Sequence, residues 1–298
     1  DWNYFEASSS FRASPLLNKS KSVQEAFRTW ENQAVSHRVR MKELEEENNR
    51  IFIHTYGLVN ELVPNVLDEQ ITLAIADYRE DMRRLASFAL GCMMGRYSLD
   101  EPGLIYAHSG NEGFDPSRYP TFPADSDGIL PLTDSDWFGG EDTANRFGDF
   151  LKAAWPAETF HENVQFVADS LAPKAGEAPM DTIRRYLATG FYKDHLQTYK
   201  KRPIYWLFTS GKKRAFSALV YLHRYSPDTL ARLRTDYVLE LQVKLDQEID
   251  RLTTEEKNAT STPTKKAATT RLKTLQTQQL ELRDYQAKLQ TPKNCDRP

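Results

Sequence analysis

Apolar residues recur at helical spacing along the last quarter of this 298-residue chain. One stripe, after Pro227, consists of Leu230, Leu233, Tyr237, Leu241, Leu245, Ile249 and Leu252. The polar stretch TTEEKNATSTPTKKAATT ends it, and a second stripe at mostly heptad spacing consists of Leu272, Leu275, Leu282 and Leu289. Two helices with one apolar face each and a polar linker between them bury those faces against each other. The pattern predicts an antiparallel helical hairpin; an intermolecular coiled coil is the less favoured alternative, because each arm is short.

The composition is that of a globular protein, with 40% hydrophobic and 27% charged residues. The chain is long enough for two or three units. It has no apolar run of about 20 residues and no secretory start. Its two cysteines, Cys92 and Cys295, show neither zinc nor disulfide spacing. We therefore expect a cytoplasmic protein without a membrane partner and, since the chain lacks an initiator Met, a fragment of a longer one.

Several further helices are predicted from caps and periodicity. Ser22 is a candidate cap for a helix over 22–50, and an apolar stripe that includes Met82, Leu85 and Met93 predicts another over 77–95, ending at Gly95. The acidic stretch 96–163 is rich in Pro and Gly and predicts mostly loops. Modest helices are expected over 144–155 and 162–170, then one over 180–201 interrupted near Gly190. A short strand is expected over 70–73.

The segment KKRPIYWLFTSGKKRAF, residues 200–216, predicts a β-hairpin. Ile204, Trp206 and Phe208 alternate with Tyr205 and Leu207 as in a strand, and turn residues follow before a second β-rich segment. In that second segment Phe216, Leu219, Val220 and His223 would also suit a helix. The expected fold class is mainly α with a small β component. We expect a helical connector over 1–95, a mixed α+β target-recognition region over 96–226, and the helical hairpin over 227–298.

Positive charge is concentrated in one part of the chain. Residues 183–234 contain twelve basic and two acidic residues, although the whole chain has a net charge of -3. Aromatic residues are interleaved with these cations, as in surfaces that bind phosphates and stack on bases. The window therefore indicates a polyanion as partner, while a merely solvated basic face is the alternative.

No catalytic or metal-binding motif is complete. His161-Glu162 has no second histidine at zinc spacing, and Ser210-Gly211-Lys212 lacks the glycine that opens a phosphate loop. The acidic cluster around Asp125, Asp127 and Asp134 does not follow the spacing of a calcium loop. We therefore predict no catalytic, metal-binding or cofactor-binding residue in this chain.

Three stretches resemble a known family in order and spacing. They are IFIHTYGLVNELVPNV with ITL, FALGCMMGRYSLDEPGLIYA, and FYKDHLQTYKKRPIYWLFTSGKKRAFSALVYLHRYSPDTLARLRTDYV. They resemble the C-terminal part of the PglX family, the adenine-specific DNA methyltransferases of BREX phage-defence systems, and related single-chain restriction-modification enzymes. The likeness covers roughly residues 1–245. Near its start, Ser9 and Ser10 stand where the family usually has Trp and Asp.

The resemblance implies a parent enzyme that transfers a methyl group from S-adenosylmethionine to the N6 of adenine in flipped DNA. This chain has no Asn/Asp-Pro-Pro-Tyr motif and no cofactor glycine loop, so whether it acts as an enzyme itself stays open. Its implied role is to recognise and grip double-stranded DNA. The predicted DNA-binding residues are Arg184, Arg185, Lys200, Lys201, Arg202, Tyr205, Trp206, Lys212, Lys213, Arg214 and Arg224. Acidic phage DNA-mimic proteins would compete for them.

The alternative hypothesis is a protein-interaction scaffold. In that case the acidic loops and the helical hairpin dock other defence components, and the basic window meets an acidic protein.

Overall fold

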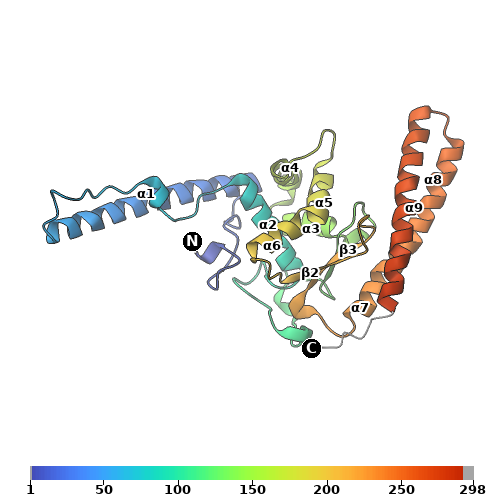
Figure 1. Cartoon of the computed structure of the whole chain (residues 1–298), viewed down its shortest axis with the longest axis horizontal. Helices are drawn as coiled ribbons and strands as arrows, with labels where there is room; N and C mark the ends of the chain where they lie inside the picture. Colours follow the sequence, from blue (N-terminus) through green and yellow to red (C-terminus); the bar gives the residue numbers. More distant parts are fainter. Residues whose placement is uncertain (1, 291–298) are drawn as a thin grey trace.

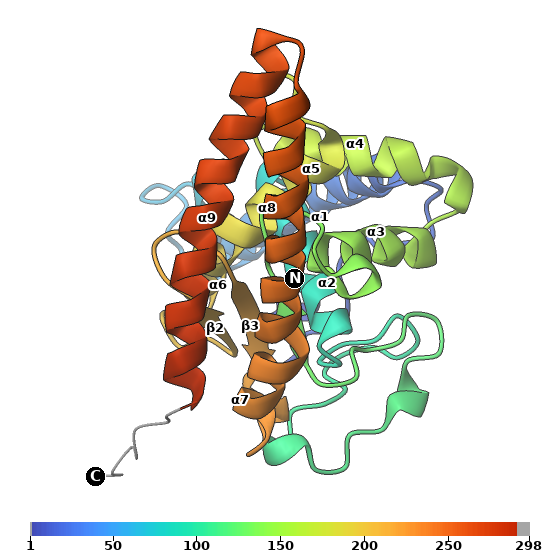
Figure 2. The same cartoon turned by 90° about the vertical axis from the view of Figure 1, so that its right-hand side faces the viewer.

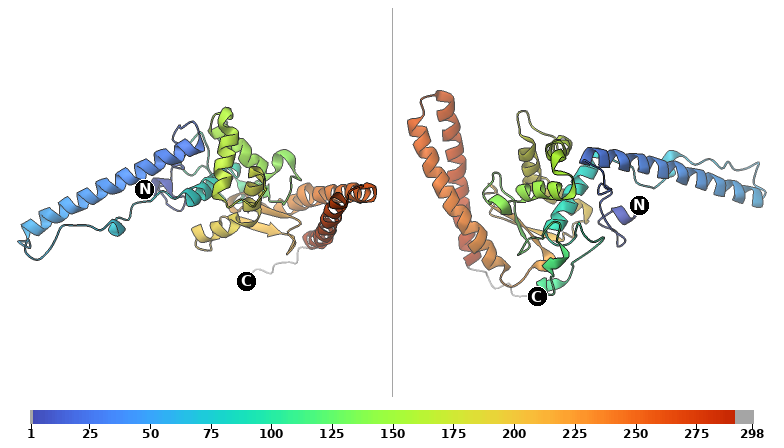
Figure 3. Two further views of the ribbon diagram at one scale, coloured as in Figure 1. Left: turned by 90° about the horizontal axis from the view of Figure 1, so that it is seen from above. Right: turned by 180° about the vertical axis from the view of Figure 1, so that it is seen from behind.

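The computed structural model describes residues 2–290. It is 59% helical with 4% in strands, which confirms the expected mainly α fold with a small β component. A central body carries a long helical arm on one side and a helical hairpin on the other (Figure 1). Figure 3 shows the same arrangement from above and from behind. None of the helices within residues 2–290 is long and apolar enough to cross a membrane.

The arm begins with α1 (Val23–Thr55), which extends well beyond the body (Figure 1). Ser22 caps it as predicted, because its side chain accepts a hydrogen bond from the Glu25 N–H. Only the first turns contribute to the core, through buried residues such as Phe27 and Trp30. Val35 is exposed although the preceding Ala34 is buried, since the helix leaves the body at that point.

The chain returns along the arm without forming the strand predicted over 70–73. A single 3-10 turn (Asp68–Gln70) precedes irregular backbone. The carbonyl oxygens of Ile71 and Leu73 accept hydrogen bonds from the Arg38 guanidinium, both at 2.7 Å, rather than from a neighbouring strand. That prediction was wrong because a side chain of α1 provides the hydrogen bonds that a strand would have required.

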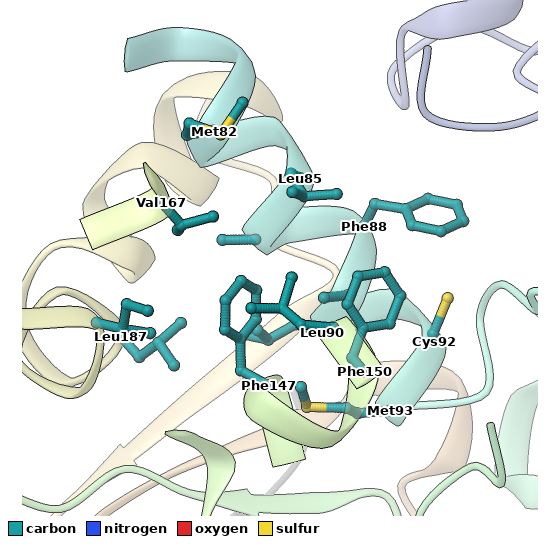
Figure 4. Packing of buried hydrophobic residues seen from close by; sticks show 14 of the residues in the cluster. Met82, Leu85, Phe88, Leu90, Cys92, Met93, Phe147, Phe150, Val167 and Leu187 are labelled. Carbon is teal, nitrogen blue, oxygen red and sulfur yellow. The ribbon is translucent and has the colours of Figure 1, made fainter. Parts of the chain in front are cut away.

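Helix α2 (Tyr78–Met93) is the centre of the larger core. It packs against α3 (Thr143–Ala154), α4 (Phe160–Ser170) and α6 (Phe191–Thr198), and α5 (Pro179–Thr189) packs on α3, α4 and α6. Figure 4 shows Met82, Leu85, Leu90 and Met93 of α2 among Phe147 and Phe150 of α3 and residues of α4 and α5. The helices predicted over 77–95, 144–155 and 162–170 and the break at Gly190 are confirmed.

The sheet has three antiparallel strands in the order β1-β3-β2. The predicted hairpin is confirmed as β2 (Tyr205–Thr209) and β3 (Ser217–Tyr221), with Trp206 opposite Val220 and Thr209 opposite Ser217. Strand β1 (Ile129–Pro131) was not predicted; it pairs with the other side of β3. Strand β3 is therefore central and fully buried, and β2 is an edge strand.

The C-terminal helices form the predicted hairpin. Helix α7 (Thr229–Arg232) continues through a π-helical stretch (Leu233–Val238) into α8 (Leu239–Asn258), and α9 (Thr262–Gln290) packs back along it (Figure 2). Leucines of both helices join Phe216 and Val220 in a second core. The tail with Cys295 lies outside the described residues, and the division into three regions stays a prediction.

Candidate nucleic-acid interface

The turn between β2 and β3 presents three exposed cations, Lys212, Lys213 and Arg214. The turn is held by a carboxylate of α9: Glu281 accepts hydrogen bonds from the Ser210 hydroxyl at 2.8 Å and the Lys213 N–H at 2.7 Å. The Ala215 N–H also donates to Glu281 at 3.2 Å. The backbone of the turn is thereby fixed to α9, while the cationic side chains stay accessible to solvent.

A second group of exposed cations, Lys200, Lys201 and Arg202, joins α6 to β2. Lys200 and Lys201 have φ values of 51° and 63°, which reverse the chain at the end of α6. The start of β2 is tied to α6 by the buried His195, whose Nε2 accepts hydrogen bonds from the backbone N–H groups of Ile204 and Tyr205. Burial and the nearby Arg96 cation lower the pKa of His195 to about 4, so the neutral imidazole needed for these bonds is the stable form.

The two groups define a candidate interface: Lys200, Lys201, Arg202, Lys212, Lys213 and Arg214, one group at each end of the edge strand β2. Within residues 2–290, none of these six side chains forms an ion pair at 4 Å or less. Exposed cations without carboxylate partners keep their charge available to a phosphate backbone.

Of the two predicted aromatic contacts, only Trp206 is accessible. Its side chain, on β2, is 40% exposed and packs beside Tyr225 with ring centroids 5.6 Å apart. Tyr205 points the other way, as expected for neighbours in a strand, and is fully buried against Tyr221. Tyr205 therefore belongs to the core, and Trp206 can meet a ligand.

Three predicted arginines are engaged by the chain's own groups. Arg184 is buried and pairs with Asp142 at 2.5 Å. Arg185 makes two hydrogen bonds to the Glu177 carboxylate, at 2.7 and 2.8 Å. Their charges are neutralised by the chain's own carboxylates, so the structure gives neither of them to the interface.

Arg224 is the third internal arginine and is only 1% exposed. Its guanidinium donates to the carbonyl oxygens of Asp125 and Ser126 at 2.6 and 2.8 Å and to the Asn111 side chain at 2.9 Å. It also lies 3.8 Å from the centroid of the Phe114 ring. Arg224 fastens the end of β3 to the acidic loops, and its burial is possible because each of its three side-chain nitrogens donates a hydrogen bond.

A cavity of about 680 Å³ lies beside the second group of cations. Lys200 and Arg202 line it together with Ser8, Ser9 and Arg96. Sequence reasoning missed Ser8 and Arg96. Arg96 lies outside the basic window, so the charge count could not find it, whereas the departure of Ser9 from the family pattern had marked this end of the chain.

Glu6 forms part of the same cavity and joins three segments. Its Oε2 accepts hydrogen bonds from the Ser87 hydroxyl at 3.0 Å and the Tyr199 hydroxyl at 3.1 Å. Burial raises the pKa of Glu6 to about 7, although these hydrogen bonds and the Arg96 cation act against the shift. The N-terminal segment is thus attached to α2 and to the end of α6, next to the candidate interface.

No group of three or more His, Cys, Asp or Glu side chains that could hold a metal ion occurs in residues 2–290.

No family model matches the chain. It is 42% identical over 278 residues to the adenine-specific methyltransferase BrxX of Escherichia coli O9:H4 (strain HS), which covers 85% of this chain and 23% of that protein. It is 40% identical over 298 residues to the adenine-specific methyltransferase PglX of Lacticaseibacillus casei (strain Zhang), covering 97% of this chain and 24% of that protein. The chain thus spans about a quarter of the length of these relatives, and we conclude that it is homologous to a region of the adenine-specific methyltransferases PglX and BrxX.

Proposed function

We propose that this chain is the DNA-gripping and target-recognition part of an adenine-specific DNA methyltransferase of a phage-defence system. The relatives are adenine-specific methyltransferases. An enzyme that modifies adenine within a duplex has to hold the DNA on both sides of the base that it extrudes. The sequence resemblance supports a place in the C-terminal part of a BREX enzyme that works in the cytoplasm.

The observation that carries this proposal is the set of six exposed cations at the two ends of β2. Four other basic or aromatic candidates are engaged inside the protein, yet these six have no ion pair within residues 2–290. Phosphate contacts of Lys and Arg supply most of the sequence-independent affinity for DNA. Trp206, between the two groups, offers a ring for stacking or groove contact.

Methyl transfer itself is proposed to take place in protein outside this chain. A nucleotide-type cofactor is usually held at a glycine-rich turn between a parallel strand and a helix. The described residues contain one small sheet, which is entirely antiparallel, and the sequence contains no adjacent prolines for a Pro-Pro-Tyr motif. The chain does not fit S-adenosylmethionine, and we derive no step through it.

The proposal is tested by reversing the charge of each group of cations. The variants are Lys212→Glu/Lys213→Glu/Arg214→Glu and Lys200→Glu/Lys201→Glu/Arg202→Glu. We expect each to weaken binding of a 30-base-pair duplex at least about tenfold and to lower the slope of log affinity against log salt by about 2 to 3, because each lost phosphate contact contributes about 0.9. Fluorescence anisotropy at several salt concentrations measures both quantities.

A matched control reverses Lys265, Lys266 and Lys273, three exposed lysines of α9, and changes the net charge by the same amount. It should retain most of the affinity, because those residues lie away from β2. Equal loss of binding in the control and in the test variants would mean that only overall charge matters. Unchanged binding in folded test variants would remove the basis of the proposal. An acidic DNA-mimic protein should compete with the duplex for the same six residues.

A further inference from the structure

Exposed apolar side chains are concentrated on residues 35–75, which form the arm beyond the buried first turns of α1. Of the large hydrophobic residues of 2–290 that are exposed, most lie here, with Tyr56 at 70% and Val63 at 77% exposed. The arm residues concerned are Val35, Val39, Met41, Leu44, Ile51, Phe52, Tyr56, Val59, Leu62, Val63, Leu67 and Ile75. Outside the arm the same property is found only singly, at positions such as Leu104, Val243 and Leu280. Patches of this kind mark surfaces that another macromolecule covers.

The arm is held in one shape before any partner binds. Arg38 donates to three backbone carbonyls of the returning segment, those of Asp68, Ile71 and Leu73, at 2.7 to 2.8 Å. Lys42 pairs with Asp68 at 2.7 Å, and the Asn49 amide donates to the Pro64 carbonyl at 3.1 Å. A surface ordered in advance binds without the cost of ordering it at the moment of contact.

Between α1 and the returning segment runs a groove of about 600 Å³. Val35, Val39 and Ile75 line it and are themselves exposed, and Ala34 and Ile71 form buried parts of its wall. Its lining is half apolar and half charged, with Lys42 and Glu46 among the charged residues. A partner protein whose contact surface combines apolar and polar side chains fits this mixed lining.

The charge of the arm argues against nucleic acid as the occupant. Residues 35–75 contain four Lys or Arg residues against seven Asp or Glu residues. A negative surface repels phosphates and, for the same reason, disfavours pairing of two identical arms. The remaining candidate is the surface of a different protein region. The relatives are about four times longer than this chain, so most of each relative has no counterpart in it.

We infer that the arm is the docking surface for the part of the same methyltransferase polypeptide that lies outside this chain. Residues 35–75 then connect the DNA-gripping body to that part as a stiff, apolar contact rather than as a flexible linker. The inference rests on the proposed function for the identity of the partner, but not on the cations at β2.

Hydroxyl-radical footprinting tests the inference with proteins as they exist and without DNA. Side-chain labelling of residues 35–75 is measured in this chain and in the aligned segments of full-length BrxX and PglX. We expect strong labelling here and at least about fivefold weaker labelling in both full-length proteins, since interface cores pack like protein interiors. The exposed Val243 and Leu280 of the C-terminal hairpin serve as internal controls in the same samples.

Equal labelling of the arm in the isolated chain and in the full-length proteins would overturn the inference. If labelling of the arm in the isolated chain falls as the concentration of that chain rises, and its sedimentation coefficient increases, the surface binds a second copy. That result would also overturn the inference. The variant Val39→Asp/Ile75→Asp should leave duplex binding unchanged. Failure of the docking inference and failure of the DNA proposal are therefore seen in separate measurements.

Discussion

Glu281 of α9 accepts a hydrogen bond from the hydroxyl of Ser210, 71 residues earlier in the chain, at 2.8 Å. The same carboxylate binds two backbone N–H groups of the turn that carries Lys212, Lys213 and Arg214. The C-terminal helical hairpin thus shapes the cationic turn although it contributes no cation to it. This relationship makes the first prediction possible.

Replacing Glu281 by Ala should loosen the turn and weaken duplex binding, with a loss of about 2–3 kcal/mol in unfolding free energy, because three hydrogen-bond donors of the turn lose a charged acceptor. Burial acts to raise the pKa of Glu281, but the hydrogen bonds from Lys213, Ser210 and Ala215 lower it overall. The stabilisation is therefore present above the unfolded pKa and lost as pH falls through the native pKa. Urea unfolding at pH 4 and pH 7 measures this; a pH-independent difference from wild type would contradict it.

Glu6 gives a pH dependence of opposite sign. Its pKa is raised to about 7 by burial, so its contribution to stability is fully present below about pH 4.5 and is lost as pH rises through 7. We expect Glu6→Gln to remove about 2–3 kcal/mol of this dependence between pH 5 and pH 9. The exposed Glu47→Gln is the control. Parallel stability curves for wild type and Glu6→Gln would show that Glu6 is ionised throughout this range.

Arg224→Met should destabilise the protein by about 3–5 kcal/mol, because it removes three hydrogen bonds of a buried guanidinium and leaves the buried Asp125 carbonyl without this donor. Arg232→Met is the control, since Arg232 forms a solvent-exposed pair with Asp228, and such pairs contribute little to stability. Thermal unfolding followed by circular dichroism compares them. Similar losses in the two variants would mean that Arg224 is not the fastening residue described here.

Gly91→Ala should cost about 1–3 kcal/mol through overpacking. An added Cβ would lie 2.3 Å from Cδ2 of Tyr97, and that ring cannot move away because it stacks on Phe88 with ring planes 9° apart. Gly140→Ala, where a Cβ meets nothing within 4 Å, is the matched control. Chemical denaturation of both variants checks the difference, and an unaffected Gly91→Ala would show that Tyr97 can shift after all.

Local patterns were sufficient for most of the fold. The cap at Ser22, the stop at Gly95 and the leucine stripes all act within a few residues, so the sequence displays them directly. Strand β1 escaped prediction because three residues, ending in Pro131, carry no periodicity and become a strand only by pairing with β3. The strand expected over 70–73 does not form, because the Arg38 guanidinium, from a distant part of the chain, binds the carbonyl oxygens of Ile71 and Leu73.

Candidate-site residues were harder to predict because charge alone does not reveal pairing. Arg184 donates to the Asp142 carboxylate, which is 42 positions away in the sequence, and Arg224 donates to the Asp125 carbonyl, which is 99 positions away. No pattern of neighbouring residues predicts contacts between positions so far apart in the sequence. The six cations that stay exposed lie in or beside turns at the two ends of β2, and these are the ones that the sequence window identified usefully.

The position of β2 at the rim of the sheet has one more consequence. An outer strand offers unpaired backbone groups to any other chain, and flanking lysines are a common defence against such pairing. We therefore expect the six cations also to disfavour such pairing of β2. In alanine variants of the six cations, fibre-like self-association through β2 would add to the expected loss of DNA binding. Glutamate variants keep charge beside β2, so they report on DNA binding alone.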